Sequence, residues 1–166
     1  MELINGIPAH VLLVHLVVVL VPTAAALLVG QAWVPRLRRW AGPLGPLLCL
    51  GALVMVPLTT SSGNWLQDNL PPAPLIEEHA DLGDNLLPWV IGLLVMSVLV
   101  QLVHRQTNRV DVEQGAMEPA KRHRPAPMAI LVAVLATAVA AGASYEVFRI
   151  GESGARAVWE GATNPS

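Results

Sequence analysis

Five histidines are the residues of this 166-residue chain whose side chains could do metal or proton chemistry. An imidazole nitrogen binds transition metals and haem iron, and it exchanges a proton near neutral pH. The single cysteine, Cys49, excludes an intrachain disulfide and a metal cluster built from cysteines. We find no recognisable nucleophile with its base, no phosphate-binding loop and no acid–base pair, which argues against an enzyme.

The positions of the histidines decide which of them can share a site. His104 and His123 follow the third apolar stretch of the chain. If residues 75–104 form one helix, a rise of about 1.5 Å per residue places His79 about 37 Å from His104. Only His10, His15 and His79 can therefore converge.

The first apolar stretch presents its two histidines on different faces. With about 100° per residue, His15 lies on an arc of small and weakly polar residues, and such residues line packed interfaces in membranes. His10 lies about 140° away on a bulky aliphatic face that suits lipid. The first arc holds Val19, Pro22, Thr23, Ala26 and Gly30, and the second holds Val14, Val17, Val21 and Leu28. We therefore expect His15 to point into the protein and His10 to lie at the headgroup boundary.

The segment from Leu75 to Leu87 reads as an amphipathic helix that extends the third span. Its carboxylates cluster on one side, and His79 projects from the other side with Leu82 and Leu86. The clustered acids are Glu77, Glu78, Asp81 and Asp84. We predict that His79 faces the protein and the acids face water, as a solvated face rather than a cation site.

Two inward histidines on different helices could hold a b-type haem axially or bind a transition metal. We therefore predict His15 and His79 as cofactor-binding residues, with His10 as an alternative metal ligand. The structural alternative is that an inward histidine near a helix end hydrogen-bonds a backbone carbonyl, such as the one freed by Pro22.

The elements that must position these residues follow from composition. Hydrophobic residues make up 54% of the chain and charged residues 13%, against about 25% charged residues in soluble domains. A bilayer core needs about 20 apolar residues in a helix, because lipid offers no partner to a free backbone group. Four stretches qualify, at residues 9–34, 43–60, 75–104 and 127–148. We predict an all-α, antiparallel bundle of four transmembrane helices that forms a single integral membrane domain over residues 1–166.

The distribution of basic residues predicts the orientation of this bundle. Residues 35–42 carry three arginines, and residues 105–126 carry Arg105, Arg109, Lys121, Arg122 and Arg124. Residues 61–85 carry no Lys or Arg but five acids. Basic loops stay in the cytoplasm, so we expect loops 35–42 and 105–126 there and both termini outside. Nine arginines against one lysine, with abundant alanine, are typical of a bacterial source and indicate the bacterial inner membrane.

The segment Gly6-Ile7-Pro8-Ala9-His10-Val11-Leu12-Leu13-Val14-His15 resembles the opening of bacterial membrane proteins grouped as domain of unknown function 2231. The likeness continues through residues 60–64, 78–83 and 149–159 and covers nearly the whole chain. Val11 stands where that family often has proline, and Asn64 where an acidic residue often follows the glycine. The family has no established activity. Some relatives are fused to Rieske-type iron–sulfur domains, so the resemblance implies a redox setting.

Two functional hypotheses follow. In the first, the protein binds a redox cofactor, b-type haem or a metal, and transfers electrons to a redox partner. In the second, it is a non-catalytic membrane subunit or anchor that docks a protein partner through its acidic outer loop and C-terminal tail. A transporter ranks below both, because no polar residues line the second or fourth span. Nucleic-acid binding is excluded by the net charge of -2 and by basic residues that serve topology.

Overall fold

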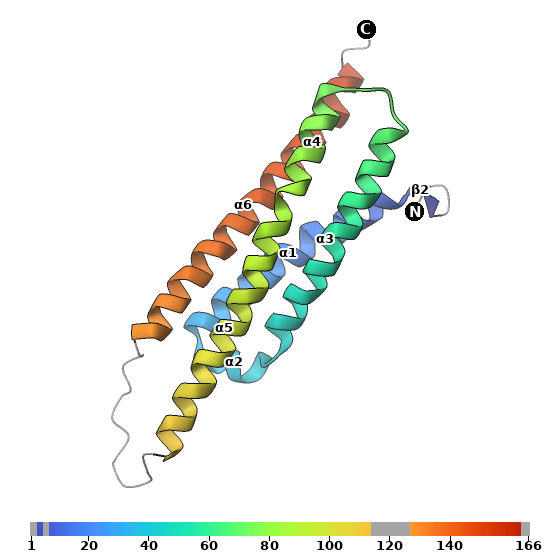
Figure 1. Ribbon diagram of the computed structural model, residues 1–166. Helices are drawn as coiled ribbons and strands as arrows, with labels where there is room; N and C mark the ends of the chain where they lie inside the picture. The colour runs from blue at the N-terminus through green and yellow to red at the C-terminus, as the bar shows by residue number, and fades with distance from the viewer. Residues whose placement is uncertain (1–2, 5–6, 114–126, 164–166) are drawn as a thin grey trace.

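The computed structural model describes residues 3–4, 7–113 and 127–163, and nearly all of them are helical. Strands β1 (Leu3–Ile4) and β2 (Ile7–Pro8) pair antiparallel just before the first helix. Six helices follow: α1 (Ala9–Trp33), α2 (Pro35–Ala41), α3 (Leu44–Asp68), α4 (Pro74–Asp84), α5 (Leu86–Glu113) and α6 (Pro127–Thr163) (Figure 1). The predicted all-α fold class is confirmed.

Four helical stretches are long and apolar enough to cross a membrane: Ala9–Trp33, Leu44–Asp68, Pro74–Val103 and Pro127–Trp159. They run alternately up and down the bundle (Figure 1). Their exposed surfaces carry large aliphatic side chains such as Val19, Leu47 and Val95. Such a surface needs lipid around it, so the chain is a multi-pass membrane protein.

The helices extend beyond the apolar stretches from which we predicted them. Helix α3 continues to Asp68 rather than ending near residue 60, and α6 continues to Thr163 rather than 148. The third span is two helices, because a turn at Asn85 separates α4 from α5. Hydropathy marks where lipid ends, and a helix can continue into water on side-chain packing alone. Lys121, Arg122, His123 and Arg124 lie outside the described residues.

Helices α1 and α5 each pack against both α3 and α6, which closes the bundle around one core. Large side chains such as Leu28 and Leu93 are fully buried beside alanines such as Ala136 and Ala143. A stripe of alanines along α6 is buried, so its small side chains let the neighbouring helices approach closely: Ala129, Ala133, Ala136, Ala140 and Ala143.

The predicted facing of α1 is wrong. Val17, Val21 and Leu28 are buried, whereas Val19 on the arc of His15 is 65% exposed. Bulky residues face inward here because they fill the space left by Ala52 of α3 and by the alanines of α6. Thr23 can face outward because its hydroxyl donates to the carbonyl of Val19 within the same helix.

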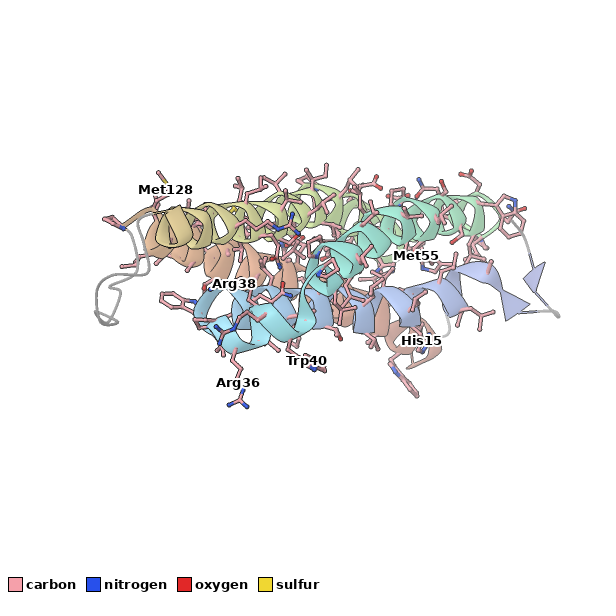
Figure 2. The ribbon with its side chains drawn as sticks, turned by 90° about the horizontal axis from the view of Figure 1, so that it is seen from below. His15, Arg36, Arg38, Trp40, Met55 and Met128 are labelled. Carbon is pink, nitrogen blue, oxygen red and sulfur yellow. The ribbon has the colours of Figure 1, made fainter. Side chains whose placement is uncertain are left out.

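A buried polar cluster closes the far end of the bundle, where α1 turns through α2 into α3. Gln31 is fully buried, and its Nε2 donates to the carbonyl of Gly42 at 3.1 Å. Gln101 donates to the same carbonyl at 2.9 Å and to Oε1 of Gln31 at 3.4 Å. Arg38 caps α1 by donating to the carbonyl of Gln31 at 2.6 Å. Arg36 and Trp40 of α2 point away from the bundle (Figure 2).

Candidate cofactor site

A cavity of about 630 Å³ lies between α1, α3, α4 and α6, at the end of the bundle where α1 begins and α3 ends. Its walls are mostly apolar, and three of its lining residues are His10, His15 and His79. We call this space the histidine cavity. Its volume lies in the range of about 300–1,000 Å³ that is usual for small-molecule and cofactor sites.

His10 enters the cavity from the first turn of α1. Its Nδ1 lies 3.1 Å from the backbone carbonyl oxygen of Thr59 on α3, and the side chain is half-buried. A carbonyl oxygen can only accept, so Nδ1 must carry the hydrogen and donate it. In the neutral tautomer with its hydrogen on Nδ1, the remaining nitrogen, Nε2, carries the lone pair.

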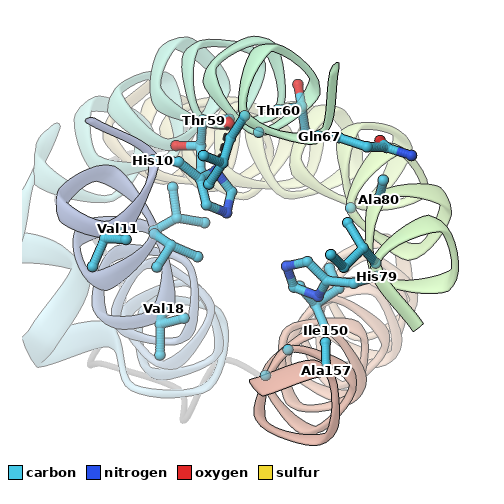
Figure 3. Close-up of a pocket in the computed structure, with 18 of the residues that line it drawn as sticks. His10, Val11, Val18, Thr59, Thr60, Gln67, His79, Ala80, Ile150 and Ala157 are labelled. Carbon is cyan, nitrogen blue, oxygen red and sulfur yellow. Dashed lines mark hydrogen bonds between the residues drawn. The ribbon is translucent and has the colours of Figure 1, made fainter. Parts of the chain in front are cut away.

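His79 enters from the opposite side, on α4 (Figure 3). Its Nδ1 lies 2.9 Å from the hydroxyl of Ser153 on α6. That hydroxyl already donates its only hydrogen to the carbonyl of Ile150 at 2.9 Å, so it accepts from Nδ1–H of His79. Nε2 of His79 therefore also carries a lone pair.

The two imidazole rings form a close pair. Their centroids are 6.2 Å apart and their planes lie at 84° to one another. In the described part of the chain, the hydrogen bonds of both rings run through Nδ1. The cavity thus holds two electron-pair donors on different helices. The tautomer of each ring is fixed by the hydrogen-bond acceptor that a neighbouring helix supplies to Nδ1.

Each ring rests on a glycine. A Cβ added at Gly63 would lie 3.0 Å from Cε1 of His10, and a Cβ added at Gly154 would lie 3.0 Å from Cε1 of His79. A serine precedes each glycine, and both hydroxyls donate to the carbonyl three residues earlier. We did not predict a role for these two glycines, although a Ser-Gly pair recurs at residues 62–63 and 153–154 on two different helices.

His15 does not lie where we predicted. Its side chain is exposed, and Nδ1 donates to the carbonyl of Val11 in its own helix. His15 still lines the edge of the histidine cavity, but the ring paired with His79 belongs to His10. The error follows from the facing of α1, since the buried arc is the one we assigned to lipid.

The predicted facing of α4 is correct. His79 is half-buried toward the cavity, whereas Glu77, Glu78 and Asp81 are exposed. Within the described residues, no group of three or more His, Cys, Asp or Glu side chains could hold a metal ion. The described lining of the cavity therefore holds three imidazoles, of which those of His10 and His79 are paired, and no carboxylate.

Glu146 is a buried acid outside the lining of the cavity. Its side chain is 8% exposed, and its carboxylate lies 3.3 Å from Nη1 of Arg149 one turn later in α6. Pairing with arginine lowers the cost of placing a carboxylate in an apolar span.

Comparison with family models, with curated proteins and with solved structures finds no match to this chain. The fold and the histidine cavity are therefore the basis for assigning a function.

Proposed function

We propose that this protein binds a b-type haem in the histidine cavity, with His10 and His79 as the two axial ligands, and that it serves electron transfer. The observation that carries the proposal is the pairing of two imidazoles, each with its Nδ1 held by an acceptor on a neighbouring helix. Histidines that ligate a metal usually donate their other N–H to a fixed acceptor, which orients the ring.

The spacing of the rings supports a shared metal. Each metal–nitrogen bond is about 2.0 Å and the ring centre lies about 1.1 Å from Nε2, so imidazoles on opposite sides of one metal have centres about 6 Å apart. The observed separation is 6.2 Å. The separation of the ring centres is therefore compatible with a shared metal.

The number of donors favours haem over a bare metal ion. A metal ion held by side chains alone is usually four-coordinate, and among the described residues no third His, Cys, Asp or Glu is placed to hold a metal ion together with His10 and His79. The porphyrin of a haem supplies four nitrogen ligands to the iron, so the protein has to supply only the axial ligands. The apolar walls of the cavity suit its hydrocarbon body.

The test is an absorption spectrum of the full chain, purified in detergent from cells supplied with the haem precursor aminolevulinate. We expect a Soret band and one haem for each chain. His10→Ala and His79→Ala should each remove the six-coordinate spectrum, and added imidazole should restore it, which a merely structural defect would not allow. His15→Ala and His104→Ala are the controls and should keep the spectrum. Protein with no Soret band and no bound transition metal would refute the proposal.

We further propose that the chain lies in a bacterial inner membrane, with both termini and the histidine cavity on the non-cytoplasmic side. The arginines of α2 lie at the end of the bundle opposite the cavity, which supports this orientation through the preference of basic residues for the cytoplasm. Membership of the domain of unknown function 2231 family is part of the same proposal and rests on the motifs around His10, Gly63 and His79.

The alternative is a membrane subunit or anchor that docks a protein partner. It is favoured by one observation, the row of exposed carboxylates along α4: Glu77, Glu78, Asp81 and Asp84. Cross-linking in membranes from the native host, compared with a variant in which all four are changed to Gln or Asn, should show a partner lost with the charges. Unchanged cross-links would remove this alternative.

A further inference from the structure

Helix α3 lines the histidine cavity with two threonines and two side-chain amides: Thr59, Thr60, Asn64 and Gln67. Thr60, Asn64 and Gln67 follow one another at intervals of four and three residues, so they share one face of the helix. The same face carries Gly63, on which the ring of His10 rests. We call Asn64 and Gln67 the amide pair. The side chain of Gln67 extends from α3 toward α4 (Figure 3).

Hydrogen bonds within α3 use the threonines but not the amide pair. The hydroxyls of Thr59 and Thr60 donate to backbone carbonyls one turn earlier in the helix. Within the described residues, the side-chain amides of Asn64 and Gln67 make no hydrogen bond. Each amide NH2 group can donate two hydrogens. The amide pair therefore offers hydrogen-bond donors to a ligand in the cavity.

The wall of the cavity toward the centre of the bundle is apolar. It includes Val56, Leu86 and Val147, which also belong to the buried core. Among the described residues, no Lys, Arg, Asp or Glu lines the cavity. A carboxylate placed against this wall would lose its hydration without gaining a partner. A ligand that carries carboxylates must therefore direct them toward the end of α3, where the amide pair lies.

The haem of the proposed function is a ligand of this kind, because it carries its propionate carboxylates on one edge of a flat hydrocarbon ring. An amide N–H donated to a carboxylate makes a charge-assisted hydrogen bond, which is stronger than a bond between neutral groups. We propose that Asn64 and Gln67 bind the propionates and so determine which edge of the haem faces the end of α3. This role of the amide pair rests on the proposed haem in the histidine cavity.

Leucine in place of each amide removes the donors at about the same side-chain volume. The double variant Asn64→Leu with Gln67→Leu keeps both paired histidines and both glycines beneath them. Asn64 is exposed and Gln67 is half-buried, so neither change disturbs the core. Asn69→Leu is the matched control. It also removes an amide from this end of the bundle, but Asn69 lies outside the lining of the cavity and donates to the carbonyl of Trp65.

The experiment compares haem with its dimethyl ester, in which the propionates carry no charge. The full chain, purified in detergent from cells grown without aminolevulinate, is titrated with each compound and followed by the Soret band. Both compounds contain the iron, so both can be ligated by His10 and His79. The quantity measured is the ratio of the two dissociation constants. The partition of each compound into detergent is the same for every variant, so a change in this ratio reports the propionate contacts.

We expect the preference for haem over the ester to fall about threefold in each single leucine variant and about tenfold in the double variant, because donors to a charged group are lost. Gln67→Lys should raise the preference, because an ammonium group attracts a carboxylate more strongly than an amide does. Asn69→Leu should keep the ratio of the unmodified chain. The position of the Soret band should be the same throughout, since the axial ligands are unchanged. Circular dichroism checks that each variant keeps its helices.

The results that would overturn this role are distinguishable from a failure of the proposed function. A Soret band with an unchanged ratio in the double variant would leave the haem in the cavity and place its propionates away from the amide pair. An equal fall of the ratio in Asn69→Leu would show an effect of leucine that is not specific to the amide pair. An unmodified chain that gives no Soret band with either compound would remove the haem, and the role of the amide pair with it.

Discussion

Gly154 of α6 lies directly beneath the imidazole of His79, so that a Cβ at this position would stand 3.0 Å from Cε1 and 3.3 Å from Nδ1 of the ring. The ring is held from one side by the hydroxyl of Ser153 and from below by the bare backbone of the next residue. A larger side chain at Ser153 or at Gly154 would change where Nε2 of His79 points. Helix α6 therefore positions the candidate ligand without supplying one.

Gly154→Val should displace the His79 ring, because the added methyl groups occupy the space that the ring needs. We expect the Soret absorbance for each chain to fall at least severalfold, with the helix content unchanged by circular dichroism. Gly51→Ala on α3 is the control and should retain full absorbance, because its added Cβ would make only an ordinary contact of 3.8 Å with Leu20 and lies outside the lining of the cavity. Equal absorbance in Gly154→Val would mean that the glycine does not seat a ligand.

Ser153→Ala should leave the Nδ1–H of His79 without its acceptor. A lost hydrogen bond of this kind costs about 1 kcal/mol in membrane proteins. We expect a lower midpoint in SDS unfolding and a shifted haem midpoint potential, because the ring loses the partner that fixes its tautomer. Ser144→Ala is the control, since its hydroxyl donates only to Ala140 in its own helix. Ser153→Thr should restore both values if the hydroxyl is what matters.

Gly142→Ala should destabilise the contact between α5 and α6. An added Cβ would collide with the indole ring of Trp89, which lies against Gly142. Overpacking of this kind costs about 1–3 kcal/mol, and we expect the thermal midpoint in detergent to fall accordingly. The double variant Gly142→Ala with Trp89→Leu should recover much of the loss. A loss that is the same in both backgrounds would show that the indole is not the obstacle.

Gln31→Leu should weaken the turn between α1 and α3. The carbonyl of Gly42 would keep one donor, Gln101, and the amide of Gln101 would lose Oε1 of Gln31. We expect a loss of about 1 kcal/mol in unfolding free energy, because buried polar groups lose a partner without gaining water. Gln67→Leu at the opposite end of α3, where the side chain is only half-buried, should have a smaller effect.

Cysteine labelling tests the proposed orientation. In a Cys49→Ala background, Asn64→Cys should react with a membrane-impermeant maleimide in intact cells, and Arg39→Cys should react only after lysis. The reason is that basic α2 is held on the cytoplasmic side while the end of α3 lies outside. The reverse pattern would place the histidine cavity in the cytoplasm.

The sequence by itself determined the class of this protein. Hydropathy over long windows predicts four membrane helices, because no other structure satisfies the backbone in lipid, and the structure confirms the helical bundle. The facing of His79 was also predictable, since four acids on one side of a short helix leave the other side for packing.

Only the tertiary structure decided which histidine meets His79. The facing of α1 depends on the shapes of its neighbours, and Ala52 of α3 and the alanines of α6 leave room for Val17, Val21 and Leu28. The same packing turns His10 toward Thr59 and leaves His15 at the edge of the cavity. The sequence of α1 alone does not determine which of its faces is buried, because packing also depends on the shapes of the neighbouring helices.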